Sequence, residues 1–385
     1  MRVILLTGKG GVGKTSLSIA TALGAAEHGH RAIVLSTDPA HSLGDALGTP
    51  VGPRPISVCS GVFAQEVGAL DELERSWSAI QHWLRGLLRG ETDELVAEEL
   101  LVFPGLEELM ALRAVREVEA RGEHDVCVVD CAPTGATLRM LRFPDALRIF
   151  MENFFEIERR GVRWLRPVVG RLGGSALLPD EEFFEAFERL YREIDDVRQI
   201  LTDGDRTTAR LVMNPARVVV EETRRSFAYL SLYGVATDAV IVNRELPPQA
   251  SGGWFARWAE KERRERADIA ASFPVPILHA PLHPTELLGV DALRRLGREV
   301  YGSRDPAAVF AEGRPIRLRK DSRGTILEID LPNASKDDLD VGVHGSELLV
   351  RVRDAHRRIA LPASLAGRTV STARLEAGVL AIRFE

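Results

Sequence analysis

The most constraining feature of this sequence is a glycine-rich octapeptide at residues 8–15, which matches the pattern G-x-x-x-x-G-K-[ST]. An apolar run precedes it at residues 3–6, and a stretch with helical character follows at 16–23. Glycines let consecutive backbone N–H groups converge on phosphate oxygens, and the following helix adds its positive dipole end. We therefore expect bound ATP, with Lys14 on the β- and γ-phosphates and the Thr15 hydroxyl on Mg²⁺. The residues expected to contact the nucleotide here are Gly8, Lys9, Gly10, Gly11, Val12, Gly13, Lys14, Thr15 and Ser16.

Short apolar runs recur through the first 300 residues, at 32–35, 126–129, 209–213, 239–242 and 275–278. Such runs, without polar alternation, are typical of strands that are covered on both faces. Helical patterns lie between them. The sequence therefore predicts an α/β fold over residues 1–302, built on a doubly wound, mostly parallel sheet.

Two helical inserts are expected within this domain, at about residues 71–120 and 145–201. The second contains a dense apolar cluster that includes Phe150, Phe154, Phe155 and Trp164. Such a cluster is either ordinary core or a groove for an apolar partner helix. We take these four residues as the candidate client groove.

The pattern changes after Tyr301. Residues 303–314 resemble a linker, and from 315 to 385 apolar residues alternate with polar ones, as at 327–331, 348–353 and 380–384. A period of two, with turn residues between the runs, predicts a small antiparallel β-sandwich over 315–385.

Two aspartates follow predicted strands of the first domain. Asp130 ends the run at 126–129, the position from which a carboxylate holds Mg²⁺ through water. Asp38 follows the run at 32–35 and is placed to orient the attacking water in line with the γ-phosphate. We expect catalysis to depend on Asp38 and Lys14, and magnesium binding on Thr15 and Asp130.

Composition limits the alternatives. The formal net charge is −6, which argues against a nucleic-acid binder held by bulk charge. The three cysteines, Cys59, Cys127 and Cys131, form neither a disulfide framework nor a C-x-x-C pair. No apolar run approaches the roughly 20 residues that span a bilayer, and the first strand begins at Val3, before any leader. We expect a cytoplasmic protein that is not integral to a membrane.

Several segments resemble the family of ArsA and tail-anchored-protein targeting ATPases. The loop has a second, early lysine, Lys9, in the form K-G-G-x-G-K-T. The segments D-P-A-H-S-L at 38–43, D-C-A-P-T-G-A-T-L-R at 130–139 and P-G-L-E-E at 104–108 are similar to the switch I, switch II and P-G-x-x-E segments of that family. Val242-Asn243 and Pro281-Leu282 resemble its I-V-N and late P-L elements.

This resemblance implies a homodimer that encloses two Mg-ATP molecules. Lys9 would act in catalysis by reaching across the interface to the partner's nucleotide. Asn243 would read adenine, and Pro281 and Leu282 would lie near the base. Loss of the γ-phosphate would release the loops at Asp38 and Asp130, and the helical inserts would follow. One branch of the family carries C-terminal membrane anchors in an apolar groove, and the other energises arsenite export.

Some residues depart from the family. Its eukaryotic targeting members carry a C-x-x-C zinc pair where this chain has G-G-W-F-A-R-W at 252–258, and Ala136 replaces the switch II histidine. The inserts are poor in methionine, and the cysteines do not occupy the metalloid positions of the family. We therefore favour a client-binding ATPase. The alternatives are an arsenite- or antimonite-stimulated pump subunit and a holdase in which nucleotide is merely structural.

The C-terminal segment has its own resemblance. Ala373 to Leu380 carries A-x-x-x-x-G-V-L, read here as A-R-L-E-A-G-V-L, and Asp330-Leu331-Pro332 matches a d-L-P segment. Both are similar to α-crystallin domains of small heat-shock proteins. This implies an accessory sandwich that binds a client or partner, or a passive cap.

Overall fold

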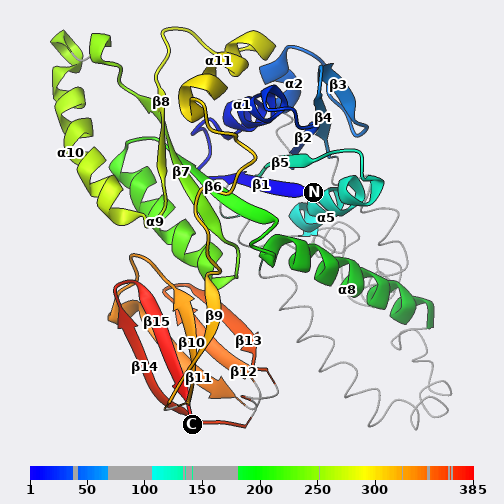
Figure 1. Ribbon diagram of the computed structural model, residues 1–385, viewed down its shortest axis with the longest axis vertical. Helices are drawn as coiled ribbons and strands as arrows, with labels where there is room; N and C mark the ends of the chain where they lie inside the picture. Colours follow the sequence, from blue (N-terminus) through cyan, green and yellow to red (C-terminus); the bar gives the residue numbers. More distant parts are fainter. Residues whose placement is uncertain are drawn as a thin grey trace, which may run out of the picture.

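The apolar runs of the first 300 residues form the centre of an eight-stranded sheet in the computed structural model (Figure 1). The structure describes residues 1–37, 42–67, 106–132, 135, 141, 181–250, 252–322, 324–344, 347–362, 365 and 367–385. The strands are β1 (Arg2–Thr7), β2 (Ala32–Ser36), β3 (Ile56–Cys59), β4 (Val62–Glu66), β5 (Val126–Asp130), β6 (Thr207–Met213), β7 (Thr237–Glu245) and β8 (Ile277–Pro281). Their order is β3-β4-β2-β5-β1-β6-β7-β8, and β3 alone pairs antiparallel, at one edge.

Helices cover both faces of this sheet, which is why its central strands bury apolar residues on both faces. Val3 and Leu5 of β1 pack on one face and Ile4 and Leu6 on the other, all fully buried or nearly so. The first face lies under α5 (Leu106–Arg121), α8 (Glu181–Thr202), α9 (Arg217–Leu232) and α10 (Ala256–Ser272). The second lies under α1 (Lys14–Glu27), α2 (Ser42–Leu47) and α11 (Gly289–Tyr301). Among the described residues, no helix has the length and apolar character needed to cross a bilayer.

Residues from 316 onward form two antiparallel sheets with a shared core. One sheet has the order β14-β15-β10-β9 and the other β11-β12-β13. The strands are β9 (Ile316–Asp321), β10 (Gly324–Asp330), β11 (Leu339–His344), β12 (Glu347–Val352), β13 (Ala355–Ala360), β14 (Val370–Glu376) and β15 (Val379–Phe384). Their alternate residues, such as Ile329, Val350 and Ile382, are completely buried between the sheets. The predicted fold class, a doubly wound sheet followed by a small β-sandwich, is confirmed.

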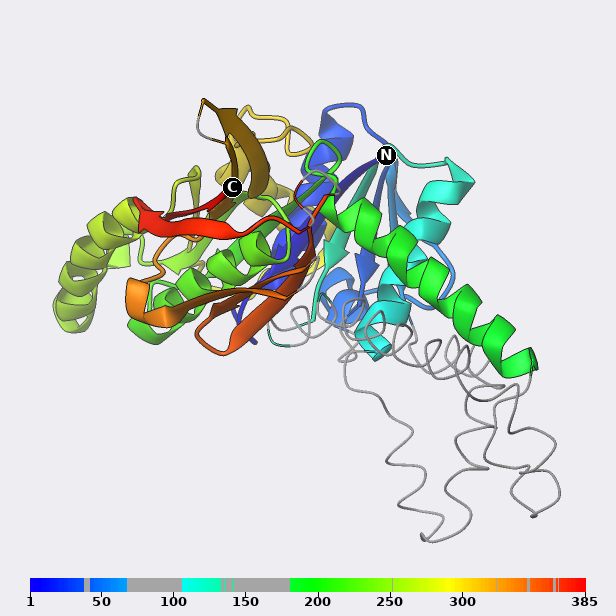
Figure 2. The same ribbon diagram turned by 90° about the horizontal axis from the view of Figure 1, so that it is seen from below.

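Helix α9 joins the sandwich to the larger sheet. Tyr229 and Leu232 of α9 belong to the apolar core of the sandwich, and the sandwich strands lie beside α9 in both views (Figures 1 and 2). The Tyr233 hydroxyl donates to the His356 carbonyl over 3.0 Å, and Arg357 reaches back to the Leu232 carbonyl over 2.5 Å. The sandwich is therefore docked on the first domain.

The segment 303–314, expected to be a linker, lies against the large sheet, and we call it the strap. Arg2 and Arg210 donate to the carbonyl oxygens of Ala307 and Ala308, at 3.1 and 3.0 Å. The backbone N–H of Phe310 donates to Asp238 at 3.3 Å. A strap bonded at successive residues holds the connection between the two sheets in place.

Candidate nucleotide site

The phosphate loop connects β1 to α1, and its glycines are required by its backbone. Gly11 and Gly13 have φ angles of 77° and 96°, in the left-handed region that favours glycine. A Cβ at Gly8 would lie 2.2 Å from the carbonyl oxygen of Val212, so the loop packs directly on the end of β6. At Gly10 and Gly11, by contrast, an added Cβ would meet no heavy atom within 4 Å. The loop backbone thus packs closely against the end of β6 at Gly8, and it has free space beside it at Gly10 and Gly11. A loop that binds phosphate needs both features.

Lys14 is the first residue of α1 and lies in the loop. Its side chain is only 6% exposed, and its Nζ lies 3.4 Å from the carbonyl oxygen of Lys9. A buried ammonium needs an anion or several acceptors. An ATP phosphate in the cradle would supply that anion.

Thr15 lies at the centre of a network of hydroxyl groups. Its Oγ1 donates to the Asp130 carboxylate over 2.7 Å and lies 3.0 Å from Oγ of Ser42. Ser18, one turn further along α1, donates to the other Asp130 oxygen over 3.3 Å. Asp130 is completely buried at the end of β5. The network joins the loop to the starts of two other segments, 131–139 and the helix α2.

This donor set fits magnesium. Hydroxyl and carboxylate oxygens are the hard ligands that Mg²⁺ prefers, together with substrate phosphates and water. Thr15 and Asp130 would hold the ion beside the open cradle, where it would offset phosphate charge.

A cleft of about 490 Å³ continues from the loop. Its lining includes Thr15, Ser16, Asn243, Pro281 and Leu282, so the structure brings together the late elements and the loop, as expected. The Asn243 side chain is 7% exposed; its Nδ2 donates to the Val12 carbonyl over 2.8 Å, and its Oδ1 accepts from the backbone of Arg244 over 2.9 Å. Asn243 therefore fixes the loop against β7 as well as lining the cleft.

Lys9 is paired within the same chain. Its Nζ lies 3.1 Å from Oε2 of Glu222 on α9, and the two side chains are 41% and 31% exposed. Sequence reasoning did not identify Glu222, because no local pattern marks an ion pair between residues so distant along the chain.

Glu66 is a second residue that the sequence did not reveal. Its buried Oε1 accepts from the backbone N–H groups of Leu43 and Gly44, each at 3.0 Å. Two orphan donors of α2 are thereby satisfied. Glu66, at the end of β4, thus sets the position of Ser42 beside Thr15.

Several expected site residues lie outside the described part of the chain. They are Asp38 and the candidate client groove of Phe150, Phe154, Phe155 and Trp164. Most of both helical inserts and of segment 133–140 lies there as well.

In the described part of the chain, the three cysteines are not grouped with other ligands in a way that would hold a metal ion. Burial raises the pKa of the Cys127 thiol to about 12. Burial and the adjacent Asp130 charge raise the pKa of Cys131 even more. Cys59 lies elsewhere, with its Sγ 3.8 Å from Arg294. Within the described residues, no three side chains of His, Cys, Asp or Glu are grouped to hold a metal ion.

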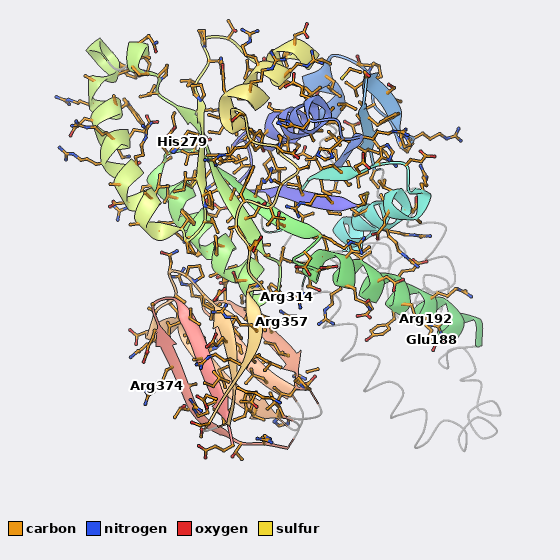
Figure 3. The ribbon with its side chains drawn as sticks, viewed as in Figure 1. Glu188, Arg192, His279, Arg314, Arg357 and Arg374 are labelled. Carbon is orange, nitrogen blue, oxygen red and sulfur yellow. The ribbon has the colours of Figure 1, made fainter. Side chains whose placement is uncertain are left out.

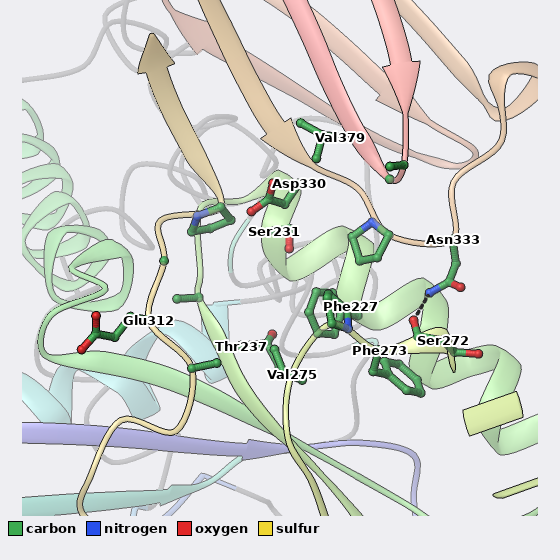
Figure 4. Close-up of a pocket in the computed structure, with 18 of the residues that line it drawn as sticks. Phe227, Ser231, Thr237, Ser272, Phe273, Val275, Glu312, Asp330, Asn333 and Val379 are labelled. Atoms are coloured by element: carbon green, nitrogen blue, oxygen red, sulfur yellow. Dashed lines mark hydrogen bonds between the residues drawn. The ribbon is translucent and has the colours of Figure 1, made fainter. Parts of the chain in front are cut away.

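A second cavity, of about 430 Å³, lies where the sandwich meets the first domain (Figure 4). Phe227 and Thr237 face it from one domain and Asp330 and Val379 from the other. Asn333 crosses the junction and donates to the Ser272 carbonyl over 2.9 Å. Arg357 lies at the same junction, between the sandwich and α9 (Figure 3). The residues that line this cavity include none of the phosphate loop.

The first domain has the sheet, loop and carboxylate of a P-loop ATPase. Comparison with known proteins identifies the family. The model of the ArsA ATPase family, described as anion-transporting ATPases, matches residues 1–302, and that of the HSP20-like domain found in ArsA matches 322–384. The chain therefore belongs to the ArsA ATPase family, and it hydrolyses ATP.

Named relatives agree with this assignment. The chain is 35% identical to a protein of Chlorobaculum tepidum named as an arsenical pump-driving ATPase, over 95% of this chain and 92% of that one. It is 33% identical to an Aquifex aeolicus protein of similar name, over 98% of each chain. ATPase GET3B of Arabidopsis thaliana is 30% identical, over 77% of this chain and 78% of its own. The resemblance to the ArsA and targeting ATPases, and to an α-crystallin domain, is confirmed.

Proposed function

We propose that the protein is a homodimeric Mg-ATPase whose hydrolysis gates an apolar surface that binds transmembrane segments of client proteins. One observation carries this proposal: the Thr15 hydroxyl contacts both Asp130 and Ser42. These two residues border the segments that resemble switch II and switch I. A change at the bound nucleotide would therefore reach both segments through one side chain.

The residues have separate roles in this proposal. Backbone amides of residues 8–16 and the Lys14 ammonium bind the phosphates, and Thr15 and Asp130 hold the magnesium ion, the latter through water. When bound, the ion neutralises charge that develops on the transferred phosphoryl group. Asp38 orients the attacking water. Lys9 of the partner subunit completes the site by stabilising phosphate charge.

Client binding is assigned to the helical inserts. Segment 130–139 is followed closely along the chain by the insert expected at 145–201, so a released switch would alter the arrangement of that insert. Phe150, Phe154, Phe155 and Trp164 would line the groove for an apolar helix. The sandwich would be an accessory surface for a client or partner, and we place the protein in the cytoplasm.

The relatives named for arsenical pumps suggest a second function, but the cysteines favour client binding. Arsenite requires soft thiolate ligands that converge. The buried thiols of Cys127 and Cys131 remain protonated because burial raises their pKa, to about 12 for Cys127. Stimulation of turnover by arsenite that depends on these cysteines would favour the pump function instead.

The decisive experiment compares the wild type with Asp38→Asn. We measure ATP turnover and capture of a transmembrane-anchor peptide, with Asp291→Asn, an exposed aspartate on helix α11, as the control. We expect hydrolysis to fall by about 100-fold or more in Asp38→Asn, because the attacking water loses its orienting group. Nucleotide binding should persist. Wild-type hydrolysis by Asp38→Asn would contradict the catalytic assignment, and peptide capture unaffected by ATP would contradict gating. A holdase would instead protect clients in Lys14→Ala as well as in the wild type.

A further inference from the structure

The ion pair between Lys9 and Glu222 conflicts with the proposed role of Lys9. That role requires the lysine to extend to a partner's nucleotide. In the single chain the Lys9 ammonium is instead directed to its own helix α9, 3.1 Å from Oε2 of Glu222. One ammonium cannot remain in this pair and also extend fully across an interface.

The carboxylate of Glu222 is held at a defined place relative to the loop. Helix α9 begins at Arg217, shortly after β6, and the end of β6 packs directly on the loop, since a Cβ at Gly8 would lie 2.2 Å from the Val212 carbonyl oxygen. The other half of α9 is fixed by the sandwich, through Tyr229 and Tyr233. Glu222 therefore presents its charge from a helix that is anchored at both ends.

We propose that Glu222 is a positioning residue that retains Lys9 in the single protomer and thereby sets how much Mg-ATP the dimer needs to assemble. This rests on the proposed function of Lys9. Binding of a second protomer brings a triphosphate with several negative charges, and that stronger anion takes Lys9 from Glu222. Assembly is thus made conditional on a loaded nucleotide site in the partner.

The strength of the pair suits a reversible restraint. Exposed ion pairs contribute little, so removing the restraint should lower the Mg-ATP concentration for half-maximal dimer formation by about two- to fivefold. The pair is also accessible to salt. Screening weakens exposed charges, so the effect should shrink as ionic strength rises.

The experiment uses the full-length chain and a non-hydrolysable ATP analogue with Mg²⁺, with the dimer fraction followed by analytical ultracentrifugation. Glu222→Gln removes the charge with little change in shape. Glu221→Gln is the matched control: Glu221 is adjacent on α9, and its carboxylate pairs with Arg224 of the same helix at 2.6 Å. Lys9→Ala and the double variant Lys9→Ala/Glu222→Gln complete the cycle. Unfolding curves that overlap with the wild type establish that each variant is folded.

We expect Glu222→Gln to assemble at lower Mg-ATP, Glu221→Gln to match the wild type, and Glu222→Gln to have no effect once Lys9 is alanine. The restraint is overturned if Glu222→Gln needs the same or a higher Mg-ATP concentration for dimer formation than the wild type. If Lys9→Ala assembles poorly in that case, the role of Lys9 still stands. Wild-type assembly and turnover by Lys9→Ala contradict the proposed function itself. An equal fall in the Mg-ATP concentration needed by Glu221→Gln overturns the proposal too, because the effect would then come from the net charge of α9 and not from the pair with Lys9.

Discussion

The side chain of Asn243 donates to the carbonyl oxygen of Val12 over 2.8 Å, which ties the end of β7 to the phosphate loop. The same amide lies where a Cβ on Gly13 would be, at 2.3 Å from Nδ2. Gly13 also has a positive φ of 96°. The residue is therefore constrained twice, by conformation and by contact.

Gly13→Ala should accordingly be more harmful than Gly11→Ala. Both variants strain a left-handed backbone, but only the first also collides with Asn243, whereas an added Cβ at Gly11 meets open space. We expect Gly13→Ala to lower the free energy of unfolding by about 1–3 kcal/mol and to weaken ATP binding. Chemical unfolding and nucleotide titration measure both effects. Asn243→Ala in the same chain should recover part of the loss; equal losses for the two glycine variants, with no recovery, would contradict the collision.

The Thr15 hydroxyl should be essential for turnover. It contacts Asp130 and Ser42, and it is the group expected to ligate Mg²⁺. We expect Thr15→Ala to lower kcat by about 100-fold, because stabilisation of the transition-state charge is lost. Thr15→Ser keeps the hydroxyl and should retain most of the activity. Steady-state ATPase assays over a range of Mg²⁺ concentrations test this, and a comparable loss in Thr15→Ser would argue against metal ligation.

The buried thiols predict an alkaline loss of stability. The pKa of Cys127 is about 12 in the folded protein and near 9 when unfolded, and that of Cys131 is raised in the same direction. Between these values the folded state binds more protons than the unfolded state, so stability falls as pH rises above about 9, by up to about 1.4 kcal/mol per pH unit for each thiol. Urea unfolding between pH 8 and 10.5 measures the slope.

Cys127→Ala and Cys131→Ala should each make that slope shallower. Cys59→Ala is the control, because Cys59 is only partly buried and lies apart from β5. Thiol labelling of the native protein should modify Cys59 and spare the other two. Rapid labelling of Cys127 or Cys131 would show that their environment is open.

Residues that specify local structure could be read from the sequence. The central strands are nearly continuous apolar runs, since both of their faces are covered. The phosphate loop has a fixed pattern that indicates where α1 begins, at Lys14, whereas the binding of Mg-ATP by Lys14, Thr15 and Asp130 stays a prediction. The edge strands β3 and β9 could not be predicted, for the opposite reason. β3 is largely half-buried and β9 is almost fully exposed, and in β9 charged residues such as Arg317 and Arg319 interrupt any apolar pattern.

Contacts between distant segments could not be read in the same way. Glu66 and Glu222 act through partners that lie far away in the sequence, and neither belongs to a recognisable motif. Gly302 and Pro306 are typical of a linker, so the composition of segment 303–314 predicts a connection and does not indicate the contacts of the strap with the sheet. The strap is bonded to Arg2 of β1 and to Arg210 of β6. The sequence around these two arginines does not indicate which segment they contact.

The strap is held by a buried ion pair, and this gives the last prediction. Arg210 and Asp238 are both completely buried, with Nε and Oδ1 3.2 Å apart, and Arg210 stacks 4.4 Å from the ring centroid of Phe310. Asp238 also pairs with Arg2 at 3.2 Å, so Arg210→Met leaves the carboxylate one partner, whereas Asp238→Leu removes the carboxylate from the buried Arg210 guanidinium. Asp238→Leu should therefore lower the free energy of unfolding by about 3–5 kcal/mol, and Arg210→Met/Asp238→Leu by clearly less. Circular dichroism during urea unfolding measures this, and proteolysis should cleave the strap sooner in the single variant. A double variant as unstable as the single one would show that packing of the strap, rather than the unpaired charge, dominates.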